Sequence, residues 1–150
     1  MIAIILALVI TVLYLYDFIK VYGVPPSISE TFYVETSLKF SITMISCAFL
    51  ICIGMNTLSQ EWYMRLIAFL SSTGLGFVGV SPWFKKHPKI HYIGAIMFLV
   101  STALWSILYS NWWITLIWLL FPILDKKRWI FWVEIYTILM FVIGLILGSI

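Results

Sequence analysis

The chain has 150 residues, of which 63% are hydrophobic and 10% are charged, and its mean hydropathy is +1.10. Soluble domains carry roughly 25% charged residues, so this composition excludes a soluble globular domain and predicts a single domain that lies almost wholly in a lipid bilayer. The net charge of +3 does not indicate nucleic-acid binding, because the Lys and Arg residues stand at the ends of apolar runs, where they act as topology signals.

The first apolar run, residues 1–16, is predicted to be a retained membrane span. A secretory signal has basic residues before its apolar core and a small-residue cleavage site after it. This run has neither, and Asp17 and Lys20 follow it instead. Positive charge after the run favours an N-terminus on the non-cytoplasmic side of the membrane.

The longest loop, before the second run, contains the sequence GVPPSISETFY. Ser27 and Glu30 have the S-x-x-E spacing of a capping box, which predicts a helix that starts near Ile28 and continues into the second span. The alternative is a cytoplasmic recognition loop, with Ser29, Glu30 and Tyr33 as candidate ligand-binding residues.

Two further runs, residues 40–58 and 66–84, have the length of single spans. Cys47 and Cys52 lie five residues apart in the first of them, so on a helix they point to different faces. We therefore expect two buried structural cysteines rather than a disulfide.

Small residues at four-residue spacing predict close helix packing in two places. Ala68, Ser72 and Gly76 share this spacing in the third span, where packing within the chain is expected. Gly144 and Gly148 share it in the last span, which is the candidate contact with a second copy of the chain.

Residues 92–124 form one apolar run that as a single helix would extend about 50 Å, which exceeds one membrane crossing. A polar Ser-Asn pair followed by two tryptophans predicts a turn near its middle, giving spans 92–109 and 112–124. The last run, residues 129–150, is the sixth predicted span.

The basic residues decide between six spans and five. With six spans, eight of the nine Lys and Arg residues fall in loops on one side and only Arg65 falls on the other, whereas five spans give five against four. The positive-inside rule therefore favours six spans with both termini outside the cytoplasm. The predicted fold is an all-α, polytopic transmembrane helical bundle with short loops, one domain over residues 1–150, and five spans are the alternative.

Glu134 is the only carboxylate inside an apolar run, six positions after Arg128. A carboxylate about 9 Å along a membrane helix is costly and usually faces the bundle interior. Two interpretations stay open. Glu134 is either a functional group, such as a proton relay, an ion ligand or an anchor for a polar ligand, or a structural carboxylate that pairs with Lys126 or Lys127.

His87 and His91 have the four-residue spacing of two metal ligands on a helix, but Pro88 disfavours helical backbone at His87. The chain has no third histidine, so we predict no metal and no cofactor. His91, at the inner entry of the fourth span, is a candidate ligand-binding residue. The sequence also lacks the short motifs of hydrolases, metalloproteases and nucleotide-binding proteins, which favours a non-enzymatic function.

Three segments, GVPPSISETFY, GLGFVGVSPWF and IHYIGA, resemble small polytopic membrane proteins of Bacteroidetes and their phages. The aromatic-rich turn followed by a histidine and small residues is also similar to the FRAG/DRAM/Sfk class, which is linked to membrane lipid organisation. The resemblance implies a six-span fold. It picks out Ser29, Glu30, Tyr33, Gly79, His91 and Gly94.

The predicted function is binding of a lipid, a small amphiphile or a membrane partner by a bundle in a bacterial inner membrane. The predicted pocket opens to the cytoplasm and is formed by Ser29, Glu30, Tyr33, His91 and Glu134. Expected partners are membrane lipids and a second copy of the chain, and no nucleic acid. The alternative is an oligomeric pore, such as a phage holin or a membrane-permeabilising defence protein, because the chain is small and carries few charges. An enzyme that acts on lipid is the third interpretation.

Overall fold

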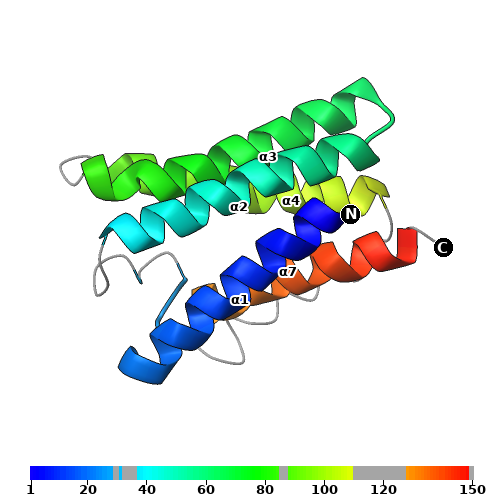
Figure 1. Ribbon diagram of the computed structural model, residues 1–150. Coiled ribbons are helices and arrows are strands. Elements are labelled where there is room, and N and C mark those ends of the chain that lie inside the picture. Colours follow the sequence, from blue (N-terminus) through cyan, green and yellow to red (C-terminus); the bar gives the residue numbers. More distant parts are fainter. Residues whose placement is uncertain (29–30, 32–36, 85–87, 110–127, 149–150) are drawn as a thin grey trace.

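The computed structural model describes residues 1–28, 31, 37–84, 88–109 and 128–148, which form an all-helical bundle without strands (Figure 1). The all-α prediction is therefore confirmed for this part of the chain. The elements are α1 (Ile2–Tyr22), α2 (Ser37–Leu58), α3 (Trp62–Val80), the 3-10 helix η2 (Ser81–Phe84), α4 (Pro88–Tyr109) and α7 (Trp129–Gly148).

By length and composition, four helices of the described chain are able to cross a membrane, which is compatible with the predicted membrane protein. They are Ile2–Tyr22, Leu38–Leu58, Trp62–Phe84 and Lys89–Tyr109. The last helix, α7, contains a shorter apolar stretch, Ile130–Ile143. The described helices thus support four spans rather than six, and the predicted span 112–124 lies outside the described residues.

Large apolar side chains point outward from these helices. On α1, Ile2 is 77% exposed and Leu13 is 60% exposed, and on α4 Ile96 is 62% exposed. In water this surface would be unfavourable, whereas hydrocarbon tails solvate it without cost. The outward apolar surface is what a helix surrounded by lipid presents.

The helices extend beyond the predicted spans. The spans were cut at charged residues, whereas a helix can continue through a charged residue. The first span was predicted to end at residue 16, yet α1 continues through Asp17 and Lys20 to Tyr22. It ends at Gly23, whose φ of 80° is rarely adopted by other residues and whose N–H donates to the carbonyl of Ile19 at 2.9 Å. The third helix likewise starts at Trp62, before Arg65, rather than at residue 66.

Ile28 is not helical and α2 is described from Ser37, but residues 29–30 and 32–36, over which the predicted helix would run, lie outside the described residues, so this helix stays a prediction. The described residues of this segment lie inside the bundle. Ser27, Ile28 and Thr31 are all buried, with exposures of 2%, 6% and 0%. Ile28 belongs to a core cluster, and the Thr31 hydroxyl donates to the carbonyl of Ile28 at 2.7 Å. The predicted capping partner of Ser27, Glu30, lies outside the described residues.

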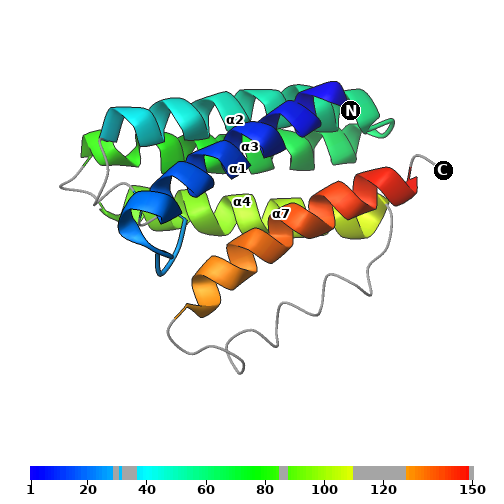
Figure 2. The ribbon, with the colours of Figure 1, turned by 60° about the horizontal axis from the view of Figure 1, so that its bottom comes forward.

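The helices are arranged so that α3 packs against both α2 and α4, α1 lies on α2, and α7 lies on α4 (Figures 1 and 2). Helices α4 and α7 run in the same direction, and both termini lie at the same end of the bundle. By contrast, α1 and α7 scarcely contact each other.

Two glycines bring the backbones of α3 and α4 together. A methyl group at Gly74 would lie 2.5 Å from the nitrogen of Phe98, and one at Gly94 would lie 2.7 Å from the carbonyl oxygen of Gly74. The predicted packing residues Ala68 and Ser72 are buried. Gly76, however, has open space where its side chain would be, so Gly74 is the contact glycine and the prediction for Gly76 is wrong.

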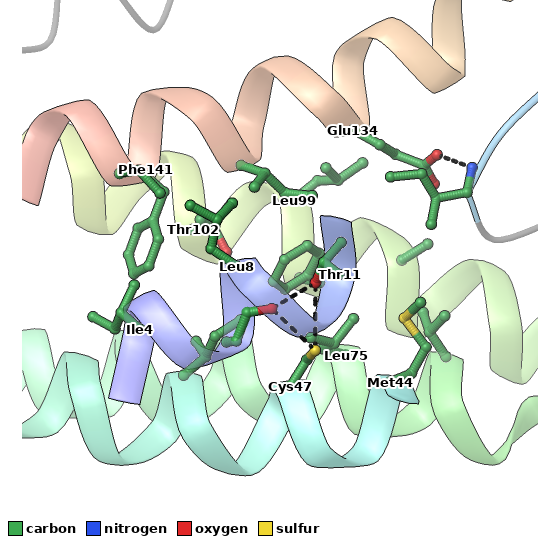
Figure 3. Close-up of a pocket in the computed structure, with 18 residues that line it drawn as sticks. Ile4, Leu8, Thr11, Met44, Cys47, Leu75, Leu99, Thr102, Glu134 and Phe141 are labelled. Atoms are coloured by element: carbon green, nitrogen blue, oxygen red, sulfur yellow. Dashed lines mark hydrogen bonds between the residues drawn. The ribbon is translucent and has the colours of Figure 1, made fainter. Parts of the chain in front are cut away.

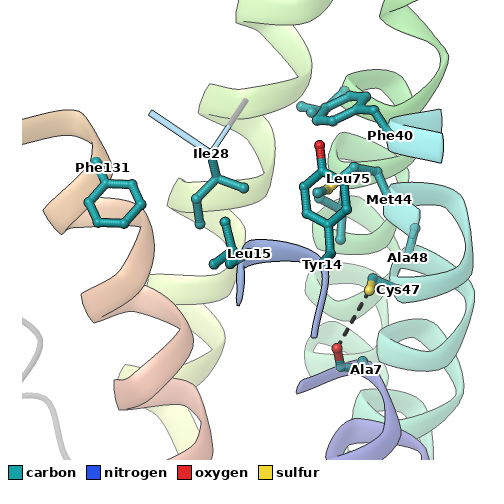
Figure 4. Close-up of a cluster of buried hydrophobic side chains, with 11 residues drawn as sticks. Ala7, Tyr14, Leu15, Ile28, Phe40, Met44, Cys47, Ala48, Leu75 and Phe131 are labelled. Carbon is teal, nitrogen blue, oxygen red and sulfur yellow. Dashed lines mark hydrogen bonds between the residues drawn. The ribbon is translucent and has the colours of Figure 1, made fainter. Parts of the chain in front are cut away.

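Buried apolar side chains form two clusters. The larger one joins α1, α2, α3 and α7 with the segment before α2 (Figure 4): Ala7, Tyr14, Leu15, Ile28, Phe40, Met44, Cys47, Ala48, Leu75, Val78 and Phe131. The smaller cluster lies nearer the termini: Ile4, Met55, Met64, Ala68, Trp105 and Phe141. Both cysteines are free, as predicted, although only Cys47 is fully buried.

Candidate functional site

A partly enclosed cavity of about 80 Å³ lies inside the bundle, on the side where α1 and α7 are separated (Figure 3). Three helices each line it with residues of one face. On each helix these residues are three or four positions apart and extend over about two turns. The lining residues are Ile4, Ala7, Leu8 and Thr11 from α1, Ala95, Phe98, Leu99 and Thr102 from α4, and Glu134, Ile138, Phe141 and Val142 from α7. Ile28, Met44, Cys47, Ile51, Leu75 and Val78 complete the wall.

The polar atoms in the middle of the cavity wall are bonded to protein atoms. The Thr11 hydroxyl donates to the carbonyl of Ala7 at 2.8 Å and lies 3.4 Å from the sulfur of Cys47. The Thr102 hydroxyl lies 2.6 Å from that of Ser71 in a buried hydrogen bond. With these groups paired, the middle of the wall is effectively apolar.

Glu134 is the only charged residue among the described residues that line the cavity. It lies near the start of α7, and its Oε2 atom accepts the backbone N–H of Ile28 at 2.5 Å (Figure 3). The carboxylate therefore faces the bundle interior at one end of the cavity, while Phe141 lies toward the other end. The predicted pairing partners, Lys126 and Lys127, lie outside the described residues.

The segment before α2 is held between α1 and α7. On the α7 side, the N–H of Phe131 donates to the carbonyl of Pro26 at 3.1 Å, next to the bond between Ile28 and Glu134. On the α1 side, Tyr14 and Thr31 form a buried hydrogen bond of 2.7 Å. The Thr31 hydroxyl donates to the carbonyl of Ile28, so Tyr14 is the donor to Thr31. These bonds hold the Ile28 side chain in the cavity wall.

His91 is buried but belongs to a different part of the bundle. Its Nδ1 atom lies 2.9 Å from the Ser81 hydroxyl, and that hydroxyl donates to the carbonyl of Val78 at 2.6 Å. His91 Nδ1 is therefore the donor to Ser81. His91 is not among the cavity-lining residues, so the structure does not bring it together with Glu134.

The other three predicted site residues, Ser29, Glu30 and Tyr33, lie outside the described residues. Within the described part of the chain, no group of three His, Cys, Asp or Glu residues is placed to hold a metal ion.

Sequence reasoning missed Tyr14, Thr31 and the α1 face of the cavity. A signal for that face is present, since Ala7, Thr11 and Tyr14 recur at helical spacing. The face is difficult to recognise because the opposite, exposed side of α1 is also apolar. The contacts of Thr31 depend on how this part of the chain lies inside the bundle, for which the sequence contains no periodic signal.

No protein-family model, curated protein or solved structure matches this chain. The function is therefore argued from the cavity and the groups around it.

Proposed function

We propose that this chain is a non-enzymatic membrane protein that binds the apolar tail of a lipid or small amphiphile between α1 and α7. The observation that carries the proposal is the cavity, whose lining is apolar except for Glu134 at one end. Its volume of about 80 Å³ exceeds the roughly 10–15 Å³ that a single water needs, and apolar cavities of such size stay dry and accept apolar guests.

The shape of the cavity supports a chain-like guest. Its lining follows α7 from Glu134 to Val142, a distance of about 12 Å at helical rise. On α1, from Ile4 to Thr11, and on α4, from Ala95 to Thr102, the lining extends about 10.5 Å, so the space is elongated along the helix axes. Because α1 and α7 scarcely contact each other, a tail can enter sideways from the bilayer.

The proposed setting is a bacterial inner membrane, crossed six times, with both termini on the non-cytoplasmic side. The parallel directions of α4 and α7 are compatible with six crossings. Charge supports the orientation. Of the described basic residues, Arg65 is near the start of α3, a helix end that lies with the termini. The others are near the helix ends at the opposite end of the bundle: Lys20 in the last turn of α1, Lys39 and Lys89 in the first turns of α2 and α4, and Arg128 directly before α7.

Thiol labelling tests this topology. In a chain in which both native cysteines are changed to alanine, Glu61→Cys and Lys20→Cys each place one exposed thiol at opposite ends of the bundle. A membrane-impermeant maleimide should label Glu61→Cys in intact cells and Lys20→Cys only after the membrane is permeabilised. The reverse pattern would contradict the proposed orientation.

Native mass spectrometry of gently extracted protein tests the binding function. Ala95 lines the cavity, whereas its neighbour Ile96 points outward, so Ala95→Phe fills the cavity and Ile96→Phe is the matched control. We expect a discrete extra mass on the wild type and on Ile96→Phe that is lost from Ala95→Phe. Equal adducts on all three proteins would refute binding in the cavity, and a ring-sized oligomer without bound mass would indicate a pore instead.

A further inference from the structure

We infer that the cavity selects short alkyl tails, of about eight carbons, and that Phe141 and Ile4 set this limit by closing one end of it. This inference rests on the proposed function and specifies the class of guest, which is a medium-chain amphiphile rather than a lipid with long tails. It follows from the packing at one end of the cavity, from the length of the cavity and from its volume.

The end of the cavity nearer the termini is closed by packed side chains. Phe141 of α7 and Ile4 of α1 both line the cavity and lie at the same end of it (Figure 3). Their exposures are 5% and 3%. Both also belong to the smaller core cluster, so protein atoms fill the space beyond them. A tail that extends along the helices from the Glu134 end therefore meets a wall here.

The two closing side chains are supported from behind. The ring of Phe141 packs on that of Trp105, with centroids 5.4 Å apart. Trp105 is 1% exposed, and its indole N–H donates to the Ser59 hydroxyl at 2.9 Å. On the α1 side, a methyl group at Gly54 would overlap the side chain of Ile4, so Ile4 lies directly against the backbone of α2. A longer tail therefore displaces neither side chain without disrupting packed protein.

Length and volume give similar limits for the tail. Phe141 follows Glu134, the charged lining residue at the other end, by seven positions of α7, which is about 10.5 Å at helical rise. An extended alkyl chain of about eight carbons has this length, since its bonds of about 1.5 Å zigzag. At roughly 10–15 Å³ for each water-sized group, the volume of about 80 Å³ holds about five to eight groups the size of a methylene.

This limit excludes the full tails of the surrounding lipids. Each leaflet contributes about 15 Å to the hydrocarbon core, so an extended lipid tail is longer than the cavity. Inside the cavity such a tail has to bend or leave between α1 and α7, and it loses contacts that a shorter tail makes along its whole length. A short closed cavity thus allows a minor amphiphile to bind in the presence of a large excess of bilayer lipid.

Monoacylglycerols test the inference, because their neutral head group stays constant while the chain changes from hexanoyl through octanoyl, decanoyl and dodecanoyl to tetradecanoyl. Native mass spectrometry in a non-ionic detergent measures the occupancy of each probe at the same mole fraction in the micelles. We expect octanoylglycerol to occupy the wild type most. Tetradecanoylglycerol should be at least about fivefold lower, because overfilling a packed space is costly. Occupancy that rises steadily to tetradecanoyl would overturn the inference.

Two variants assign the limit to Phe141. Phe141→Ala removes the ring that closes the cavity, so the preferred chain should lengthen by about two to four carbons. Phe141→Leu should give a smaller shift and retains the test if Phe141→Ala does not fold. Leu139→Ala is the control, since this side chain of α7 is 49% exposed, and it should leave the preference at octanoyl. An unchanged preference in both Phe141 variants would contradict the role of Phe141.

The outcomes separate this inference from the proposed function. Only adducts that are lost from Ala95→Phe count as bound in the cavity. Equal occupancy by all chain lengths overturns the inference while the cavity remains a tail-binding site. Failure of every monoacylglycerol to bind the wild type overturns the proposed function itself. The series on the wild type does not depend on the folding of any Phe141 variant.

Discussion

The pair α3 and α4 and the pair α1 and α7 show two ways of placing helices side by side. Between α3 and α4 the backbones touch at Gly74 and Gly94, and a buried hydrogen bond joins Ser71 to Thr102. Between α1 and α7 there is scarcely a contact, and a cavity takes the place of packed side chains.

The difference indicates where the bundle is able to accept a guest. Close backbone approach leaves no space for another molecule and fixes α3 and α4 relative to each other. On the other side, α7 is held near its start by the segment before α2, through the bonds at Pro26 and Ile28. The proposed site therefore lies between α1 and α7, which are joined through polar contacts at one end rather than by packing along their length.

The largest effect is expected from a substitution that disrupts the close packing of α3 against α4. Gly74→Ala should lower the free energy of unfolding by about 2 kcal/mol, because the methyl group meets backbone atoms of α4 that are unable to rotate away. Unfolding in mixed detergent micelles measures it. Gly76→Ala is the matched control, since open space surrounds Gly76 and the helix propensity gain is the same. Equal effects at both positions would contradict the described packing.

The second-largest effect is expected from removing the contact between the start of α7 and the segment before α2. Glu134→Leu should cost about 2 kcal/mol, because it leaves the buried N–H of Ile28 without its acceptor. Hydrogen exchange at the Ile28 amide is the direct measurement and should become faster. Glu134→Gln keeps an acceptor and should leave this exchange close to that of the wild type. Unchanged protection in Glu134→Leu would show that the contact does not hold the segment.

A smaller effect is expected on the α1 side of the same segment. Tyr14→Phe removes the donor to Thr31 and should cost about 1 kcal/mol in unfolding free energy. Tyr16→Phe, on the exposed face of α1, is the control and should change stability by less than about 0.5 kcal/mol. A loss from Tyr16→Phe as large as that from Tyr14→Phe would contradict the assigned bond.

The smallest effect is expected at the buried hydrogen bond between α3 and α4. A double-mutant cycle with Ser71→Ala and Thr102→Val should give a coupling of about 0.6 kcal/mol, which is typical between membrane helices. A cycle between Tyr14→Phe and Thr31→Val gives the coupling on the α1 side for comparison. If the Ser71–Thr102 coupling is the larger of the two, hydrogen bonding rather than glycine contact distinguishes the pair α3 and α4 from the pair α1 and α7.

Four of the described helices were predictable because each is an apolar run long enough to cross a bilayer, whereas their ends were not. Asp17 and Lys20 end the apolar run but not α1, which stops only at Gly23. The sequence also did not predict which glycine of α3 contacts α4. Choosing Gly74 over Gly76 requires the rotation of the helix, and a helix that is apolar on all sides does not reveal it.

Of the candidate site, Glu134 was recognisable because a lone carboxylate in an apolar run stands out. Its partner was not recognisable, because Ile28 is 106 residues away and contributes a backbone N–H that any residue has. His91 was grouped with Glu134 because both were expected at the cytoplasmic end of the bundle. In the structure His91 does not line the cavity that Glu134 lines, and it forms a hydrogen bond with Ser81 instead.

The hydrogen bonds between the segment before α2 and the start of α7 also set an order of assembly. Pro26 and Ile28 leave the ribosome long before Phe131 and Glu134, so their partners do not yet exist when α1 and α2 enter the membrane. The contacts of Pro26 and Ile28 with α7 are thus among the last of the described contacts to form. Until α7 arrives, the Ile28 N–H and the Pro26 carbonyl lack these two partners, and a bundle without α7 is open to degradation.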